Sequence, residues 1–383
     1  MATEWPGQQA GESLEDREAF YALLDAAPLE ALLPLAREAA AHPAFDEVVA
    51  FEIGARVADA LLRAGRFPEL EGVLDTWRRL APEVHEASAE VLAWRTELAL
   101  LRPGSPVGSA LDALARVDPL GGAVQRLAEW CLYRGLVKPA LAGLCEAWPH
   151  VLACDVLSLP LKEAFSARLV LTGLDVAQAH VAGGAEAALR EALTSFGGRG
   201  LDPRWFEGLM RVRTGLTPWR ASPDSLARLS LGELARVLRV GVMALEVELR
   251  TEHGWPLGRT QLLHPGLLAR VLDSPGVRAG LWTEPEELAV LLPDLGLLER
   301  WAGTPSEERF AHPHAHAAVA LALRPWGAWL LRLGWIRPEA LAGWWSQVPR
   351  ALAALPASLA EATSDAALAL EVQRGLLSPP PPP

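Results

Sequence analysis

A glycine–proline string recurs along this chain and constrains its fold more than any other feature. In each copy an apolar segment ends at glycine, and a proline a few residues later opens a second apolar segment that contains another glycine. The copies span residues 65–72, 135–143 and 334–343. Glycine commonly ends helices and proline suits a first helical turn. A self-similar helix–turn–helix unit is the signature of a stacked helical array.

The segments on both sides of the first two strings have helical periodicity. Around the first, the apolar positions are Val48, Phe51, Ala55, Ala58 and Leu61, then Leu70, Val73, Leu74 and Trp77. Around the second, they are Val124, Leu127, Ala128 and Cys131, then Leu141, Leu144, Cys145 and Trp148. Two helices of this length cannot bury such stripes alone, so neighbouring units must stack.

Composition agrees with an all-α fold. Leu, Ala and Arg dominate, Ile occurs only at Ile53 and Ile336, and Asn is absent. Strands prefer Ile, Val, Tyr and Thr, whereas Leu, Ala, Arg and Glu favour helices. A GC-rich genome produces the same bias whatever the fold, but codon bias cannot produce the helical periodicity. The periodicity therefore carries the prediction of an all-α protein.

The repeats resemble the tetratricopeptide repeat. That family places a small residue in its first helix, a glycine at the turn, small or apolar residues in its second helix, and often a proline after it. The matching positions are Ala58, Gly65, Leu70, Leu74 and Pro82 in one unit, and Ala128, Gly135, Ala140, Leu144 and Ala147 in another. Leu61 and Cys131 replace the large residues of the family pattern. Helical-hairpin arrays of other families share these features. The resemblance covers about 48–152 and implies an α-solenoid of helical hairpins.

Four regions are expected along the chain. A flexible segment over 1–13 precedes the helical repeat array over 14–154. An irregular all-helical region follows over 155–377, and the third string within it suggests a diverged continuation of the array. A polyproline tail covers 378–383. The most apolar stretch, 317–336, is interrupted by Arg324, Pro325 and Arg332. We therefore expect two buried helices there and no membrane span.

Charge argues against general nucleic-acid binding, because the net charge is −12 and the pI about 5.3. One segment, 190–239, is locally basic. Its candidate contacts with phosphates and bases are Arg204, Arg211, Arg213, Trp219 and Arg220. The alternative is that these arginines lie on solvated helix faces or pair with acidic residues. A nucleic-acid role requires their side chains to line one common face.

Two tryptophans are candidate anchors for a protein partner. Trp335 lies at a turn, and Trp345 lies about 100° around a helix from Trp344, so one apolar stripe cannot bury both neighbours equally. Trp is enriched at interface hot spots. We therefore expect Trp335 and Trp345 to be exposed, against the alternative that they belong to the core.

No residue cluster specifies a reaction, a cofactor or a metal. His312 and His316 stand four residues apart, a spacing that can hold Zn²⁺, with His314 between them. No HExxH motif accompanies them, and a surface or capping role is the alternative. The cysteines, Cys131, Cys145 and Cys154, form no CxxC pair. Cys131 and Cys145 lie on apolar helix faces and are expected in the core. P-loop, GxGxxG, GxSxG and kinase signatures are absent.

The function expected from these features is that of a non-catalytic scaffold or adaptor. It would bind a protein or peptide partner within a bacterial multi-protein assembly. The alternative is an accessory subunit of a nucleic-acid-processing or defence system, which would contact phosphates through 190–239. The polar, acidic N-terminus lacks the features of a signal peptide, so the cytoplasm is the expected location. The oligomeric state stays open.

Overall fold

The computed structural model confirms the all-α prediction, and its described residues contain no strand. It describes residues 22, 26–41, 47–118, 120–199, 204–217, 219, 221–263, 266–283, 285–303 and 312–377. The expected flexible segment over 1–13 and the polyproline tail over 378–383 lie outside these residues.

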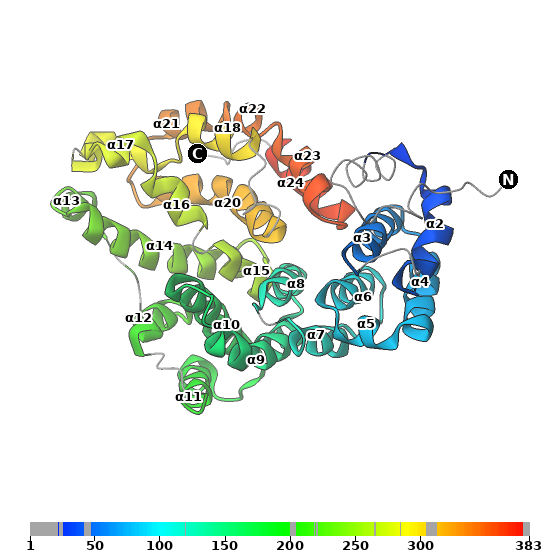
Figure 1. The fold of residues 1–383 in the computed structure, drawn as a ribbon. Coiled ribbons are helices and arrows are strands. Elements are labelled where there is room, and N and C mark those ends of the chain that lie inside the picture. The colour runs from blue at the N-terminus through cyan, green and yellow to red at the C-terminus, as the bar shows by residue number, and fades with distance from the viewer. Residues whose placement is uncertain are drawn as a thin grey trace. The chain divides into compact units, whose positions relative to one another are not determined.

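The chain divides into two compact units, residues 1–119 and 120–383. The expected array over 14–154 therefore includes parts of both units. The first unit contains α2 (Leu29–Glu38), η2 (Ala39–Ala41), α3 (Glu47–Arg63), α4 (Phe67–Leu80), α5 (Pro82–Ala87), α6 (Ala89–Leu101) and α7 (Val107–Ala115) (Figure 1). Consecutive helices of this unit pack against each other, and α6 also packs on α3 and α4.

Trp77 of α4 lies at the centre of the first unit. Its indole is fully buried, and Nε1 donates a hydrogen bond to the carbonyl of Ala36 in α2 at 2.5 Å. The edge of its ring meets Trp94 of α6, with 6.0 Å between ring centroids. A Cβ on Gly54 of α3 would lie 2.9 Å from both indoles. Glycine at this position therefore allows α3 to approach the tryptophan pair closely.

The second unit contains the remaining elements. They begin with α8 (Gly122–Tyr133), α9 (Val137–Ala153), α10 (Leu159–His180), α11 (Gly184–Gly197), α12 (Arg204–Arg213), α13 (Pro223–Leu226) and α14 (Leu231–Thr251). Short elements follow: α15 (Leu257–Thr260), η3 (Gln261–Leu263), α16 (Gly266–Leu272), α17 (Pro275–Arg278), η4 (Leu281–Thr283) and η5 (Pro285–Leu291). The last helices are α18 (Leu295–Gly303), α20 (Pro313–Arg332), α21 (Pro338–Trp345), α22 (Val348–Ala351), α23 (Leu355–Ala362) and α24 (Ala366–Leu377).

Helix α20 is the central helix of the second unit. It packs against α8 from the start of the unit, against α14 and α16 from its middle, and against α21, α23 and α24 from its end (Figure 1). The expectation of two helices in this stretch is wrong, because α20 continues through Pro325. A proline removes one backbone hydrogen bond, and burial on many sides holds the helix together regardless. None of the described helices is long and apolar enough to cross a membrane.

The three glycine–proline strings form the same turn. Gly65, Gly135 and Gly334 have φ values of 67°, 78° and 71°. After each glycine, the next amide donates to the carbonyl five residues earlier: Arg66 to Leu61 at 2.9 Å, Leu136 to Cys131 at 2.7 Å, and Trp335 to Leu330 at 3.0 Å. These bonds define the Schellman helix terminus, which requires positive φ at the glycine. The repeated string therefore encodes a repeated local structure.

We predict that His85 of α5 makes stability depend on pH. Burial, assisted by the positive charges of Arg95 and Arg78, lowers the pKa of this imidazole to about 4. Neither ring nitrogen has a hydrogen-bond partner among the described residues. The unfolded chain therefore takes up the proton first, and stability is lost as pH falls from about 6.5 towards 4.

Urea unfolding of the full chain at pH 7 and pH 5 measures this effect. We expect a loss of about 1–2 kcal/mol that His85→Leu removes. His150→Leu, at an exposed histidine, serves as the control and should leave the pH dependence unchanged. Equal pH dependence in the wild type and in His85→Leu would contradict the prediction.

Candidate functional site

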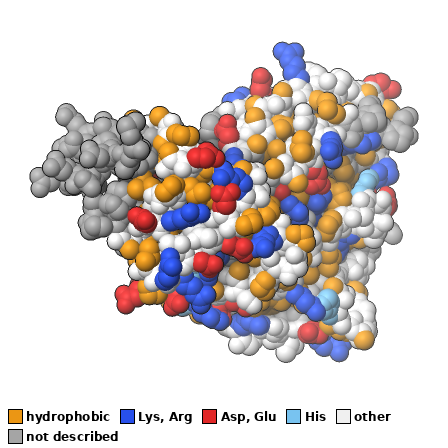
Figure 2. All heavy atoms as spheres, turned by 90° about the vertical axis from the view of Figure 1, so that its right-hand side faces the viewer, with side chains coloured by type: hydrophobic (Ala, Val, Ile, Leu, Met, Phe, Trp, Pro, Cys, Tyr) orange, Lys and Arg blue, Asp and Glu red, His pale blue; other side chains and the backbone are white. Residues whose placement is uncertain are grey.

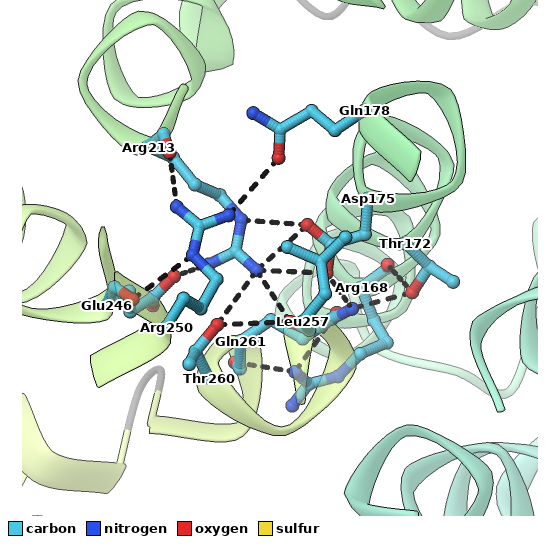
Figure 3. Close-up of polar contacts among 10 residues, drawn as sticks. All are labelled: Arg168, Thr172, Asp175, Gln178, Arg213, Glu246, Arg250, Leu257, Thr260 and Gln261. Carbon is cyan, nitrogen blue, oxygen red and sulfur yellow. Dashed lines mark hydrogen bonds and ion pairs between the residues drawn. The ribbon is translucent and has the colours of Figure 1, made fainter. Parts of the chain in front are cut away.

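A stripe of buried polar side chains runs along helix α10. Arg168, Thr172 and Asp175 are spaced by four and three residues, so they share one face of the helix. Their exposed fractions are 7%, 0% and 0%. The apolar residues between them pack into the core, and the polar stripe faces α12, α14 and η3 (Figure 3).

Arg213 at the end of α12 occupies the centre of this polar region. Its Nε and Nη2 donate to Asp175 Oδ1 at 3.1 and 2.9 Å, and Nη2 also lies 2.9 Å from Oδ2. Glu246 of α14 pairs with the same guanidinium from another side. Nη2 further contacts the carbonyl of Leu257 and the hydroxyl of Thr260, both at 3.3 Å (Figure 3). One buried arginine thus joins α10, α12, α14 and α15.

The formal charges of this buried network balance. Three guanidinium groups, those of Arg168, Arg213 and Arg250, accompany three carboxylates, those of Glu129, Asp175 and Glu246. Burial raises the pKa of Asp175, while the charge of Arg213 opposes the rise. Burial and repulsion from Arg213 lower the pKa of Arg250 to about 10. Buried charges require such pairing, because a single unpaired charge costs several kcal/mol.

The network continues to His312, which precedes α20. Gln261 Nε2 donates to Asp175 at 3.1 Å, and Arg168 donates to the carbonyl of Gln261 at 2.7 Å. Arg168 also lies 3.3 Å from Glu129 of α8. The other oxygen of Glu129 lies 3.0 Å from Nδ1 of His312. Burial raises the pKa of Glu129, but the His312 hydrogen bond and Arg168 outweigh it and hold that pKa below its usual value.

His312 lies in the wall of a surface pocket of about 450 Å³. The pocket is formed by the start of α8, the end of α9 and the start of α10. Its lining residues are Leu120, Gly122, Ala123, Gln125, Arg126, Val151, Leu157, Leu161, Phe165 and His312. The lining is apolar apart from Gln125, Arg126 and His312. This composition, apolar walls with few polar groups, is typical of a binding pocket.

The three histidines of the 312–316 string have different neighbours. His312 meets Glu129, whereas His314 Nε2 lies 3.2 Å from Asp365 and its ring stacks on Trp130. His316 packs against Trp301, with ring centroids 5.7 Å apart. Burial lowers the pKa of His314. The structure therefore does not bring these imidazoles together as ligands of one metal.

A different group of possible metal ligands exists. Among the described residues, Glu248, Glu252 and His253 have ligand atoms within 4.8 Å of one another. Arg332 already forms an ion pair with Glu248. Arg332 therefore already provides a positive charge beside these carboxylates.

The expected exposure of Trp335 and Trp345 is wrong, because they are only 2% and 4% exposed. Trp335 directly follows the glycine of a Schellman turn, a position whose side chain commonly packs back on the helix. Its ring lies 5.6 Å from Trp219 and 6.1 Å from Trp329. Trp345 is covered because α21 packs against both α20 and α22. A single apolar stripe was expected on this helix, but two faces of α21 are buried.

The candidate arginines do not form a common exposed face among the described side chains. Arg213 is enclosed, and the expectation that it is available to a phosphate is wrong. Arg211 pairs with Glu186 at 3.6 Å and with Glu207 at 3.9 Å. The side chains of Arg204 and Arg220 lie outside the described residues.

Trp219 is the remaining candidate residue of the 190–239 segment. Trp219 is half-buried and stacks on Trp329, 4.9 Å away. Acidic and basic side chains are interspersed on the face drawn in Figure 2, which is not the face that presents α11 to α13. A nucleic-acid interface over 190–239 gains no support from these positions.

Sequence reasoning missed most of the buried network. Glu129, Arg168, Asp175 and Glu246 were not selected, because their ion-pair partners lie on other helices, far away in the sequence. One signal was available: Arg168, Thr172 and Asp175 form a polar stripe within an apolar run. Cys131 is buried as expected, whereas Cys145, also expected in the core, is only partly buried. Burial raises the pKa of the Cys131 thiol to about 12.

We predict that Arg213→Met destabilises the protein by about 3–5 kcal/mol, because Asp175 and Glu246 are then left buried without a counter-charge. Arg211→Met is the control, two residues along the same helix. Its ion pairs are partly exposed, and we expect a change within about 1 kcal/mol. Urea unfolding gives both values.

A second set of variants separates lost charge pairing from lost packing. Adding Glu246→Gln to Arg213→Met restores the balance, because Arg168 and Arg250 then accompany Glu129 and Asp175. The double variant should recover part of the lost stability. If it is no more stable than Arg213→Met alone, uncompensated charge is not the cause of the loss.

Comparison with protein-family models, with curated proteins and with solved structures finds no match for this chain. The resemblance to the tetratricopeptide repeat stays a prediction.

Proposed function

We propose that this protein is a non-catalytic adaptor that binds a partner protein at the pocket formed by α8, α9 and α10. One observation carries the proposal: large apolar side chains are exposed around this pocket. Leu120, Leu152, Val156, Leu159 and Leu161, here called the α9–α10 patch, are 49%, 51%, 82%, 68% and 57% exposed. Leu120 and Leu161 line the pocket itself. Contiguous exposed apolar surface is typical of interaction sites.

The rest of the second unit supports a structural role for its charged residues. Inside the core, Arg168 pairs with Glu129, and Arg213 pairs with Asp175 and Glu246. The buried Cys131 is a poor nucleophile, because burial raises the pKa of its thiol. These features favour a scaffold that presents a surface.

The repeat interpretation belongs to the same proposal. We propose that α3 with α4, and α8 with α9, are related hairpins of a tetratricopeptide-like array. Each pair is joined by the same Schellman turn and packs together. The remaining elements of the second unit would be a diverged continuation around α20. A bacterial multi-protein assembly in the cytoplasm is the proposed setting.

We predict that Leu161→Asp abolishes partner recovery, because it places a charge in the apolar contact area. Leu370→Asp is the matched control, since Leu370 of α24 is similarly exposed, at 52%. Affinity purification from the source cells, with quantitative mass spectrometry, compares the wild type and both variants. A photo-cross-linking residue at position 159 identifies which protein contacts the patch.

The expected result is a stoichiometric partner that is recovered with the wild type and Leu370→Asp, and is lost with Leu161→Asp. Circular dichroism and urea unfolding confirm that both variants are folded. A partner that is retained by Leu161→Asp, or no stoichiometric partner at all, would contradict the proposal.

A further inference from the structure

The surface around the pocket combines a hollow with apolar side chains that project beside it. The hollow is the pocket itself, with a volume of about 450 Å³ and mostly apolar walls. Leu152, Val156 and Leu159, here called the knob residues, are not among its lining residues and are 51%, 82% and 68% exposed. They lie at the end of α9, in the turn that follows, and at the start of α10. One surface of the chain therefore carries both an apolar hollow and apolar side chains that fit such a hollow.

A hollow and knob residues on the same surface match a second copy of the chain. A twofold axis through the α9–α10 patch places the knob residues of each copy over the pocket of the other, so that two identical contacts form at once. Twofold contacts between identical patches are the commonest arrangement of soluble oligomers. An unrelated protein needs a matching surface of its own, whereas this chain already supplies both halves of the contact.

The apolar area of the patch agrees with the size of a stable dimer contact. Its five aliphatic side chains are about half or more exposed, and together they present on the order of 500 Å² of apolar surface. A standard interface buries about 800 Å² on each copy, and in homodimers about 65% of that area is apolar. The α9–α10 patch therefore has the area of the apolar part of such an interface.

The charges next to the knob residues do not oppose this contact. Asp155 and Glu163 are exposed, and Lys162 donates a hydrogen bond from Nζ to the carbonyl of Leu152 at 2.8 Å. Because both signs are present, a copy that faces this surface meets an ammonium group as well as carboxylates. The net charge of the chain is −12, but repulsion between exposed charges of two copies is largely screened beyond about 8 Å at physiological salt.

We propose that the partner at the pocket is a second copy of this chain, bound through the α9–α10 patch of both copies. Val156 and Leu159 of each copy enter the pocket of the other, against the lining residues Leu161 and Phe165. This inference rests on the proposed function and names its partner. The dimer presents every other surface twice, which raises the avidity of an adaptor for a repeated target.

Light scattering after size-exclusion chromatography tests the proposal on the purified full-length protein, at loading concentrations from about 1 to 100 µM. We expect twice the chain mass of 41.2 kDa at the upper end. Leu159→Asp places a charge in both apolar contacts and should raise the dissociation constant about a hundredfold. Leu370→Asp, at a leucine that is 52% exposed on α24, is the control and should stay dimeric. Circular dichroism and urea unfolding confirm that both variants are folded.

A mixture of two variants tests whether the knob residues occupy the pocket. Ala123→Trp fills the pocket from its own wall and should prevent dimerisation, as Leu159→Asp does. A mixed dimer of the two variants keeps one intact contact, between the pocket of one copy and the knob residues of the other. We therefore expect the mixture to dimerise more weakly than the wild type but more strongly than either variant alone.

Cross-linking tests the same contact without blocking the pocket. A photo-cross-linking residue at position 159, in a mixture of isotopically light and heavy chains, should link to residues 120–126 or 161–165 of the other copy. Light–heavy links at these positions support the proposal. Links that join only position 159 to its own chain overturn it.

The outcomes separate this inference from the proposed function. A monomer at the highest concentration, or a dimer that folded Leu159→Asp leaves intact, overturns the second copy as the partner. If purification from the source cells then yields a different protein that is lost with Leu161→Asp, the adaptor function stands. If the cells yield neither a second copy nor another partner that depends on Leu161, both proposals fail.

Discussion

The second unit depends on one buried cation. The guanidinium of Arg213 has no exposed surface, and its partners come from α10, α14 and α15. Such a group is tolerable only when every partner is in place, since an arginine cannot lose its proton to escape burial. The arrangement therefore couples four helices, because none of them can move without leaving a buried charge unpaired or exposing it to water. Its contribution lies in fixing one arrangement more than in adding net stability.

The same network fixes the wall of the pocket. Gln261 donates a hydrogen bond to Asp175, and Arg168 donates one to the carbonyl of Gln261. Arg168 also forms an ion pair with Glu129, whose second carboxylate oxygen lies beside His312. His312 is also the residue from which α20 starts. The position of the pocket wall thus follows from contacts deep in the core. A surface that is held in this way pays little ordering entropy when a partner binds, which favours affinity.

Local features were readable from the sequence, whereas contacts between distant residues were not. The three glycine–proline strings predicted helix ends, and Gly65, Gly135 and Gly334 do form one type of turn. Leu70 and Trp77 are buried as their periodicity predicts. Such features depend on neighbours within a turn or two of helix. Arg213 was placed on the surface because its partners lie 38 and 47 residues away, at Asp175 and Thr260.

The pocket also depends on contacts that the sequence does not show. Leu159 and Leu161 open a helix, where apolar residues are usually read as core. Only the packing of α8 and α9 beside them reveals that this end of α10 lacks a cover among the described elements.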